Sequence, residues 1–416
     1  MFRKLFFCFL LFFCVVPSIV FASDGALVKV GGKFYDSLSE AILNVSANET
    51  IMLLSDVELE DSLIIDKVVN LNLNDNDIVA PSMVFLVQGG TLNLSGAGII
   101  RENQPNYGAV MIKGSGNSDD SKYSVLNVSK DVNLEGWSGI FINHNNSKAY
   151  GIEVNFSGKI KAVNDTGGGT GIGIYVNGNI NDDNNAPVVN ILDGASITSS
   201  GNGLYIAGYS VFNVGKAYIS GIESGIGIKS GVLNIDGATV ECLGEDNTPT
   251  LGYNNGMKAS GTTIQIESNN GYAGDMEIDI NSGNFKSKDS NVIYEYIGKG
   301  NNSLVKSINI SGGNFNGGKN VFEVTDSFRQ KHGSFITGGN YSSDPSSYLV
   351  NGYKAVNDNG MFNVVKSTMK EVLLFSGNDK TNESSGIVIF SFLVTIGIII
   401  LILINRKRIL NLLSRS

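Results

Sequence analysis

Residues that could act as acids, bases or metal ligands are few and widely separated in this chain of 416 residues. Between the two ends, the only arginines are Arg101 and Arg329, and the chain has two histidines, His144 and His332. Glycosidases need two carboxylates that flank the scissile bond, and polysaccharide lyases need a base close to acids that hold a metal. Each of these four residues stands in a different stretch without a partner motif, so we predict no catalytic site and leave an enzyme as the alternative.

Acidic residues that are neighbours in the sequence offer little metal or acid–base chemistry. Asp119-Asp120 and Asp182-Asp183 lie in polar stretches, and neighbours in a strand point to opposite faces, so we interpret both pairs as solvated loops. Asp75-Asn76-Asp77 could contact calcium, but calcium takes six or more oxygen ligands and no loop of matching length is evident.

Zinc and phosphate sites are not indicated either. Two histidines and Cys242 lie too far apart in the sequence to give a zinc-ligand spacing. The glycine-rich run Gly167–Gly171 lacks the lysine and the following helix of a phosphate-binding loop. We therefore predict no metal and no cofactor.

Aromatic residues recur at one position of a short motif of the form glycine, aliphatic, any residue, aliphatic. Three copies, at residues 139–142, 173–176 and 203–206, carry Phe141, Tyr175 and Tyr205 at the variable position, and the only tryptophan, Trp137, lies close by. In a strand the aliphatic residues would face the core and the aromatic residue would face outward. We predict an exposed aromatic column that binds sugar rings or a partner chain; self-packing that stiffens the sheet is the alternative.

These motifs belong to a longer repeat. The segment 189–197 recurs at 211–219 and at 232–240, and the aligned alanines Ala195, Ala217 and Ala238 are 22 and 21 residues apart. The motif at residues 203–206 recurs 22 residues later at 225–228, and earlier copies have wider spacing that fits loops such as residues 177–186.

A repeat of about 22 residues made of short strands is typical of one turn of a β-solenoid. We therefore predict an all-β fold, a right-handed parallel β-helix, whose turns hold stacked asparagines. One helix is predicted, at Ser37–Leu43, with Asp36 or Ser37 as its cap and Glu40 at the capping-box position. That helix would close the N-terminal end of the solenoid and residues 348–365 would close the other.

Two groups of segments resemble known families. Residues 34–78 resemble the opening of pectin-lyase-like β-helix proteins, through Glu49–Leu54 and Val69–Leu73. Residues 308–315 and 336–345 resemble the closing repeats of surface proteins from low-GC Gram-positive bacteria. The resemblance covers roughly residues 30–366 and implies a right-handed parallel β-helix on a bacterial surface.

Charge and cysteine content narrow the choice of partners. Removing the six basic residues of the two ends from the 30 lysines and arginines leaves 24 against 39 acids, so the part between carries about −15. Such a charge repels nucleic acid, and we predict no nucleic-acid partner. Cys242 is the only cysteine after the first 22 residues, so the fold must be held by its core without an internal disulfide.

The two ends predict a secreted protein with a membrane anchor. Residues 1–22 have the basic start, apolar run and small residues of a signal peptide. An apolar stretch over residues 386–405 is long enough to span a membrane, and the basic tail 406–416 places it on the cytoplasmic side. Residues 23–50 would form the cap with its helix, 51–366 the β-helix with its C-terminal cap, and 367–385 a linker.

This pattern of signal, body, apolar span and basic tail resembles Gram-positive cell-wall-anchored proteins. Residues 378–382, Asn-Asp-Lys-Thr-Asn, resemble one class of wall-sorting motif, with Asp379 in place of its proline. We predict a single-pass protein of the cell membrane, with wall attachment as an alternative. Its expected role is an adhesin or binding scaffold for glycans or proteins; the alternatives are a carbohydrate-active enzyme of the same fold and a structural spacer.

Overall fold

The computed structural model describes residues 25–103, 108–114, 124–144, 151–163, 171–178, 186–246, 261–272 and 274–368. The predicted signal peptide 1–22, the predicted span 386–405 and the basic tail 406–416 lie outside these residues. So do residues 378–382, Asp119-Asp120 and Asp182-Asp183. No helix within the described ranges has the length and apolar character that crossing a membrane requires.

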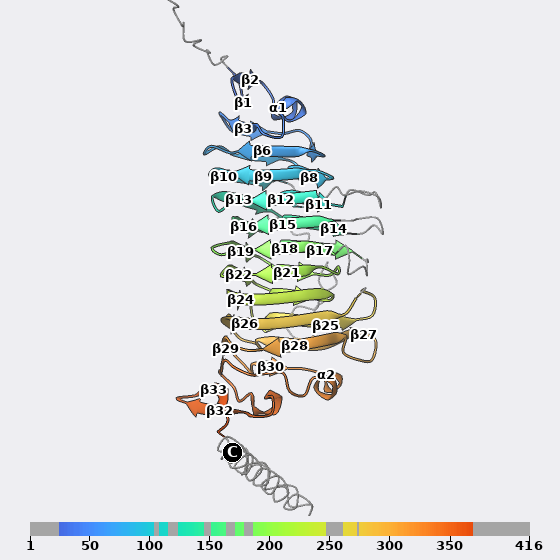
Figure 1. Cartoon of the computed structure of the whole chain (residues 1–416), viewed down its shortest axis with the longest axis vertical. Helices are drawn as coiled ribbons and strands as arrows, with labels where there is room; N and C mark the ends of the chain where they lie inside the picture. Colours follow the sequence, from blue (N-terminus) through green and yellow to red (C-terminus); the bar gives the residue numbers. More distant parts are fainter. Residues whose placement is uncertain are drawn as a thin grey trace, which may run out of the picture.

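The described chain is all-β, with strands that stack in parallel along one long axis (Figure 1). Each turn of the chain, which we call a rung, contributes three strands, and each strand pairs with its counterparts in the rungs before and after. Strands at the first and second positions of the rungs belong to one sheet, the first sheet, and strands at the third position form the second sheet. This arrangement fits a parallel β-helix.

The strands at the first position are β3 (Thr50–Leu53), β6 (Val68–Asn72), β9 (Thr91–Ser95), β12 (Ser124–Val128), β15 (Ile152–Phe156), β18 (Val188–Ile191), β21 (Val211–Val214), the first half of β24 (Gly231–Cys242), the first half of β26 (Met276–Ser287) and β28 (Val305–Ile310). Those at the second position are β4 (Val57–Glu58), β7 (Ile78–Ala80), β10 (Gly98–Glu102), β13 (Val132–Gly136), β16 (Lys159–Ala162), β19 (Ser196–Ser199), β22 (Tyr218–Gly221), the second halves of β24 and β26, β29 (Asn314–Asn316) and β31 (Asn340–Tyr341). The second sheet consists of β5 (Leu63–Ile65), β8 (Phe85–Gln88), β11 (Val110–Lys113), β14 (Ser138–His144), β17 (Ile172–Gly178), β20 (Asn202–Ile206), β23 (Ser224–Ile228), β25 (Thr262–Asn269), β27 (Ile293–Lys299) and β30 (Phe322–Glu323).

The sequence repeat corresponds to this stacking. Ser196 pairs with Tyr218, and Tyr218 pairs with Thr239, so the preceding alanines of the three copies stack as predicted. In the second sheet Leu204 pairs with Ile226, which confirms the alignment of the glycine motifs. A step of 21 or 22 residues is therefore one rung.

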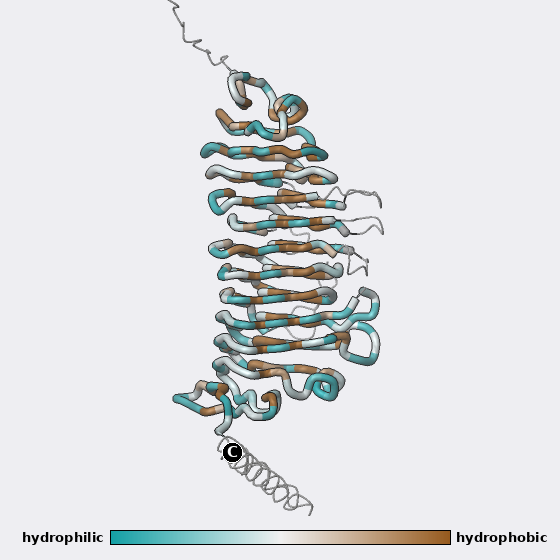
Figure 2. Tube along the Cα trace, in the orientation of Figure 1, coloured by the Kyte–Doolittle hydropathy of each residue, from teal (hydrophilic) through white to brown (hydrophobic). Residues whose placement is uncertain are grey.

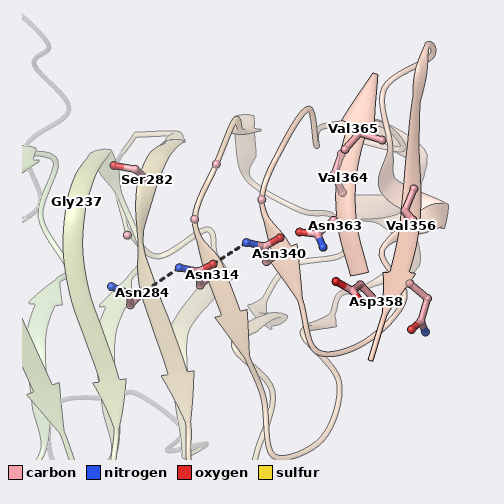
Figure 3. A pocket seen from close by; sticks show the side chains of 15 residues that line it. Gly237, Ser282, Asn284, Asn314, Asn340, Val356, Asp358, Asn363, Val364 and Val365 are labelled. Carbon is pink, nitrogen blue, oxygen red and sulfur yellow. Dashed lines mark hydrogen bonds between the residues drawn. The ribbon is translucent and has the colours of Figure 1, made fainter. Parts of the chain in front are cut away.

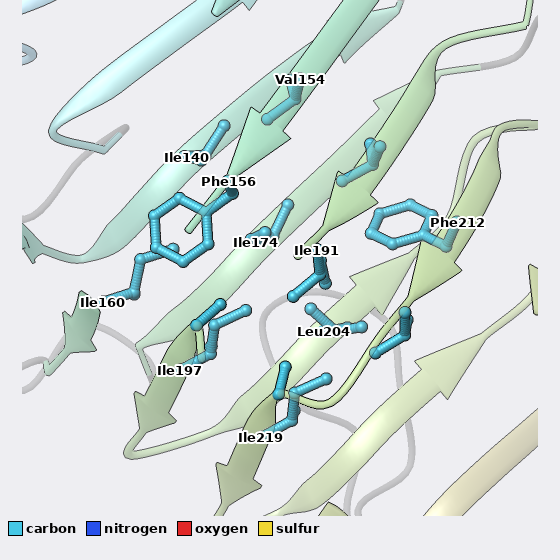
Figure 4. Close-up of a cluster of buried hydrophobic side chains, with 14 of the residues drawn as sticks. Ile140, Val154, Phe156, Ile160, Ile174, Ile191, Ile197, Leu204, Phe212 and Ile219 are labelled. Carbon is cyan, nitrogen blue, oxygen red and sulfur yellow. The ribbon is translucent and has the colours of Figure 1, made fainter. Parts of the chain in front are cut away.

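The core is a column of aliphatic side chains enclosed by the two sheets. Along the strands buried and partly exposed residues alternate, as in β18 and β19, because successive side chains point to opposite faces. Hydropathy alternates along the tube in the same way (Figure 2). Figure 4 shows Ile174, Ile191 and Leu204 meeting in the interior. Each fully buried Val, Leu, Ile or Phe contributes about 1.5–3 kcal/mol, which is how a chain without disulfides holds this shape.

The glycine of the repeated motif is required by the narrow interior. A Cβ at Gly203 would lie 2.6 Å from the carbonyl oxygen of Gly225 and 2.6 Å from Cγ2 of Ile219. Only a residue without a side chain allows the second and third strands of a rung to approach this closely.

Both ends of the stack are closed by antiparallel strands. At the N-terminal end β1 (Val28–Val30) pairs antiparallel with β2 (Lys33–Tyr35) and with β3. The predicted helix is present as α1 (Leu38–Asn44), and Oγ of Ser37 accepts a hydrogen bond from the Glu40 amide at 3.1 Å. At the other end, in the segment predicted to close the solenoid, β32 (Tyr353–Asp358) and β33 (Met361–Lys366) form a hairpin, and β33 pairs antiparallel with β31.

Two short helical segments were not predicted. Helix α2 (Asp326–Lys331) begins after the cap Thr325, and a 3₁₀ turn, η1, covers Ser346–Tyr348. Phe328 is the only buried side chain of α2, so the segment has no helical periodicity that the sequence could reveal.

Asparagines stack in the structure, but on strands rather than in turns. At the first position of the rungs, each Nδ2 donates to Oδ1 of the asparagine one rung earlier, over distances of 2.7–2.9 Å; the members of this amide ladder are Asn70, Asn93, Asn127, Asn155, Asn190, Asn213 and Asn234. The sequence analysis placed the stacked asparagines in turns. In a strand of period two, an uncharged amide at an exposed position does not stand out from other polar residues. The ladder satisfies side-chain amides along the outer face of the first sheet.

Candidate ligand-binding surfaces

The predicted aromatic column is formed by the third strands of three successive rungs. Phe141 of β14 pairs with Tyr175 of β17, and Tyr175 pairs with Tyr205 of β20. The ring centroids of Phe141 and Tyr175 are 4.8 Å apart and stacked, and those of Tyr175 and Tyr205 are 5.3 Å apart and tilted. Trp137 meets Tyr175 edge to face at 5.7 Å. The structure therefore brings all four predicted site residues together.

The column is less exposed than the sequence predicts. Phe141 and Tyr205 are only 7% and 1% exposed, whereas Trp137 and Tyr175 are half-buried. Tyr205 forms a separate hydrophobic cluster with Ile172, against which Tyr272 from the turn after β25 packs. The expectation of a fully exposed column is wrong, because strand periodicity gives the direction of a side chain but not what covers it.

Burial also fixes the protonation of the column. Desolvation, with a smaller effect from Tyr272, raises the pKa of Tyr175 to about 12. The same two causes, in the same order, raise the pKa of Tyr205 far above its ordinary value. Both tyrosines therefore keep their hydroxyl proton at neutral pH, and Tyr175 can donate it to an uncharged acceptor.

A buried ion pair follows the column on the same face of the second sheet. Nζ of Lys229 lies 2.9 Å from Oε2 of Glu267, and the two side chains are 0% and 3% exposed. The same ammonium lies 4.6 Å from the ring centroid of Tyr272 and 3.3 Å from its hydroxyl oxygen. Glu267 also accepts hydrogen bonds from Tyr296 at 2.6 Å and from Asn269 at 2.7 Å. Sequence analysis missed this pair, since its members are 38 positions apart and no regular repeat relates them.

Beyond Tyr272 the surface forms an open hollow of about 430 Å³, which we call the tyrosine groove; its lining residues are Tyr209, Asn270, Tyr272, Gly274, Asp275, Glu277, Leu304 and Lys306. Lys306 is the extra residue of a β-bulge between β26 and β28, and its Nζ lies 2.7 Å from Oε1 of Glu277. Bulges redirect side chains, and this one places a cation beside a carboxylate. The ring of Tyr209 packs directly on Gly274, where a Cβ would lie 2.2 Å from Cδ2.

A larger hollow, of about 900 Å³, lies between the first sheet and the C-terminal hairpin (Figure 3). We call it the amide groove, and its lining residues are Gly237, Ser282, Gly283, Asn284, Gly312, Gly313, Asn314, Gly339, Asn340, Val356, Asn357, Asp358, Asn363, Val364 and Val365. A second amide ladder runs along it, with Asn314 donating to Asn284 at 2.9 Å and Asn340 donating to Asn314 at 2.8 Å. Sequence analysis did not single out this groove, although the repeated Gly-Gly-Asn at residues 312–314 and 338–340 marks its floor.

Several of the scattered residues considered for catalysis or metal binding have structural partners. Nε of Arg101 bonds Oε2 of Glu135 at 2.9 Å, and Nε2 of His332 lies 2.8 Å from the carbonyl oxygen of Val305. Asp77 accepts the Ile99 amide at 2.8 Å. Cys242 is a free, buried thiol whose pKa desolvation raises to about 12.

In the described ranges no three His, Cys, Asp or Glu side chains are grouped as metal ligands would be. The two acids of the tyrosine groove, Asp275 and Glu277, are not a matched pair, because Glu277 is bound to Lys306. Comparison with known proteins gives no match to any family model, any curated protein or any solved structure.

Proposed function

We propose that the protein is a cell-surface binding scaffold whose ligands are glycans, bound along the outer face of the second sheet. The observation that carries this proposal is the continuous run of aromatic rings from Trp137 through Tyr175 and Tyr205 to Tyr272. Ring faces and edges supply apolar contact area, and the tyrosine hydroxyls supply donors and acceptors. The tyrosine groove then adds carboxylate and amide acceptors beside the rings.

The setting that we propose is the outside of a bacterial cell. The signal-like residues 1–22, the apolar residues 386–405 and the basic tail 406–416 support a secreted chain with a single C-terminal membrane span. Because crossovers between parallel strands of one sheet are almost always right-handed, we infer a right-handed β-helix. The resemblance of residues 30–366 to pectin-lyase-like surface proteins of low-GC Gram-positive bacteria supports the same placement.

A binding role fits the site better than cleavage. Glu277, the acid best placed in the tyrosine groove, is held in an ion pair with Lys306, and Arg101 and His332 are engaged elsewhere. A glycosidase would need two carboxylates free to act as acid and base or nucleophile.

The test uses residues 23–385 as purified protein on a panel of neutral, anionic and amino glycans, read out for both binding and release of products. We expect binding without cleavage, and binding weakened by about two- to tenfold in Trp137→Ala and Tyr272→Ala, since an aromatic ring contact is worth about 0.5–1.5 kcal/mol. Tyr218→Ala is the matched control, because Tyr218 is a half-buried tyrosine on the first sheet.

Two results would contradict the proposal. Glycan binding that survives both ring variants would remove the aromatic face from the site, and product release would favour the enzyme. Absence of binding to any glycan of the panel would leave the structural spacer.

A further inference from the structure

We propose that the amide groove is a second binding site, which holds an extended, uncharged glycan chain running along the long axis of the stack. The groove lies on the first sheet and at the C-terminal end, and its lining shares no residue with the aromatic face. It therefore adds a site to the one proposed above and does not depend on it.

The floor of the groove is bare backbone. Gly283, Gly313 and Gly339 stack in three successive rungs with φ of +142°, +114° and +103°. The rings of Phe285, Phe315 and Tyr341 stack directly beneath, with centroids 4.7 and 4.9 Å apart. A Cβ at Gly313 would lie 3.1 Å from Cε2 of Phe315 and 3.3 Å from the carbonyl oxygen of Gly283, and these tight contacts at a positive φ favour glycine. Glycine in a strand marks a bulge, a tight bend or a place where a ligand or another backbone approaches closely, and the register shift opposite Ser282 and Gly283 is such a bulge.

The amide ladder in the groove has hydrogen-bonding capacity to spare. A primary amide has two N–H donors and two lone pairs on oxygen, and the ladder uses one donor and one lone pair of Asn314. Asn284 and Asn314 are exposed, and Figure 3 shows Asn284, Asn314 and Asn340 in a row along the groove. Spare donors and acceptors therefore recur at the rung spacing of about 4.8 Å.

The hairpin of β32 and β33 closes the groove beyond Asn340, because β33 pairs with β31 and places Asn363 opposite Asn340. Val356 and Val365 line the groove, and each is 41% exposed. Exposed valines at this end suit the apolar face of a sugar ring, whereas the amide ladder suits its hydroxyls. Asp358 is the only ionisable residue in the lining, so nothing in the groove neutralises an anionic ligand.

The pairing of the floor strands argues against a peptide ligand on the floor of the groove. A peptide that joins a sheet needs an edge with free backbone groups. The floor strands have none, because β29 pairs with β26 and β31, and β31 pairs with β29 and β33. Recognition on the floor must therefore use side chains and glycine Cα surface, which fits a polyhydroxylated chain, whereas among the described strands β32 at the end of the groove pairs with β33 alone.

The test compares binding of cellohexaose, maltohexaose and hexagalacturonate to the 23–385 protein and to Val356→Arg, which projects a long side chain into the groove. We expect at least one neutral hexasaccharide to bind and Val356→Arg to weaken it about tenfold or more. The matched control is Val68→Arg, at a valine 37% exposed on β6, far along the stack. A thermal melt of each variant checks folding, and Asn357→Ala provides a second, milder change in the groove.

The outcomes separate the two sites. If Val356→Arg loses hexasaccharide binding and Tyr272→Ala keeps it, the amide groove is supported and the result counts against the aromatic face. If Tyr272→Ala loses binding and Val356→Arg keeps it, the amide groove alone is overturned. Hexagalacturonate binding that Val356→Arg abolishes would overturn the uncharged ligand, and failure of both neutral hexasaccharides to bind the unchanged protein would overturn the site.

Discussion

The buried pair of Lys229 and Glu267 offers the sharpest test of the packing on the second sheet. Lys229→Met retains the length and most of the volume of the side chain but removes its charge. Glu267 would then keep the hydrogen bonds from Tyr296 and Asn269 and lose the ammonium that lies 2.9 Å from its Oε2. Leaving one member of a buried pair uncompensated costs about 3–5 kcal/mol. Loss of the cation–π contact with Tyr272 adds about 0.5–2 kcal/mol.

The measurement is the free energy of unfolding in urea, followed by far-ultraviolet circular dichroism. Because neighbouring rungs stabilise each other in a stacked repeat, the change is read as a shift between variants rather than as an absolute value. Lys306→Met is the control, since Lys306 pairs with Glu277 at 2.7 Å but is 60% exposed, and an exposed pair contributes about 0–1 kcal/mol. The double variant Lys229→Met/Glu267→Gln should recover part of the loss, because no unpaired charge then remains buried. A shift in Lys229→Met no larger than that in Lys306→Met would refute the reasoning.

Two further predictions concern the first sheet. Asn190→Asp should lower the free energy of unfolding by about 1–3 kcal/mol, because an ionised aspartate cannot donate to Oδ1 of Asn155 at 2.8 Å. Asn190→Gln is the control, since it keeps the amide and changes only the length of the side chain. An unchanged urea midpoint in Asn190→Asp would contradict a stabilising ladder. Cys242 should resist a thiol reagent at pH 8 in the folded protein and react once urea unfolds it, since its pKa of about 12 lies above the ordinary value of 9.0. Because folding raises the pKa of this thiol, the thiol favours the folded state below pH 9, and that contribution is lost as the pH rises towards 12. Rapid labelling of the native protein at pH 8 would argue against the burial of Cys242.

Sequence reasoning recovers the features that repeat and misses those that occur once. The spacing of Ala195, Ala217 and Ala238 gives the rung, because every rung must return an inward residue to the same place. The glycine of the motif, as at Gly203, follows from the same repetition. The ring stack of Phe141 and Tyr175 could likewise be predicted, since parallel strands in register place equivalent residues side by side.

Contacts between rungs of unequal length could not be predicted in this way. Lys229 and Glu267 pair only because β23 and β25 align after an irregular connection, and no spacing rule fixes that register. Tyr272 packs against the cluster that contains Tyr205, and it comes from the turn after β25, outside the repeated motifs. The amide groove forms only if the hairpin β32–β33 lies beside Asn314 and Asn340. The hydropathy of the sequence does not show how the hairpin is oriented relative to these residues.

The two outer faces of the stack hold their polar side chains in different ways, and this difference affects how each face presents groups to a ligand. On the first sheet the long ladder is anchored at its N-terminal end, where Nδ2 of Asn70 donates to the carbonyl oxygens of Ala47 and Glu49. That anchor sets one direction for the amides that follow, and Asn190, Asn213 and Asn234 of this ladder line an open hollow of about 590 Å³. On the second sheet the ammonium of Lys229 holds the ring and hydroxyl of Tyr272 at the mouth of the tyrosine groove. Binding groups gain affinity when they are held in place before the ligand arrives. Lys229→Met should therefore weaken glycan binding under conditions where the variant is still folded, whereas Asn190→Asp should weaken stability and leave binding at the tyrosine groove unchanged.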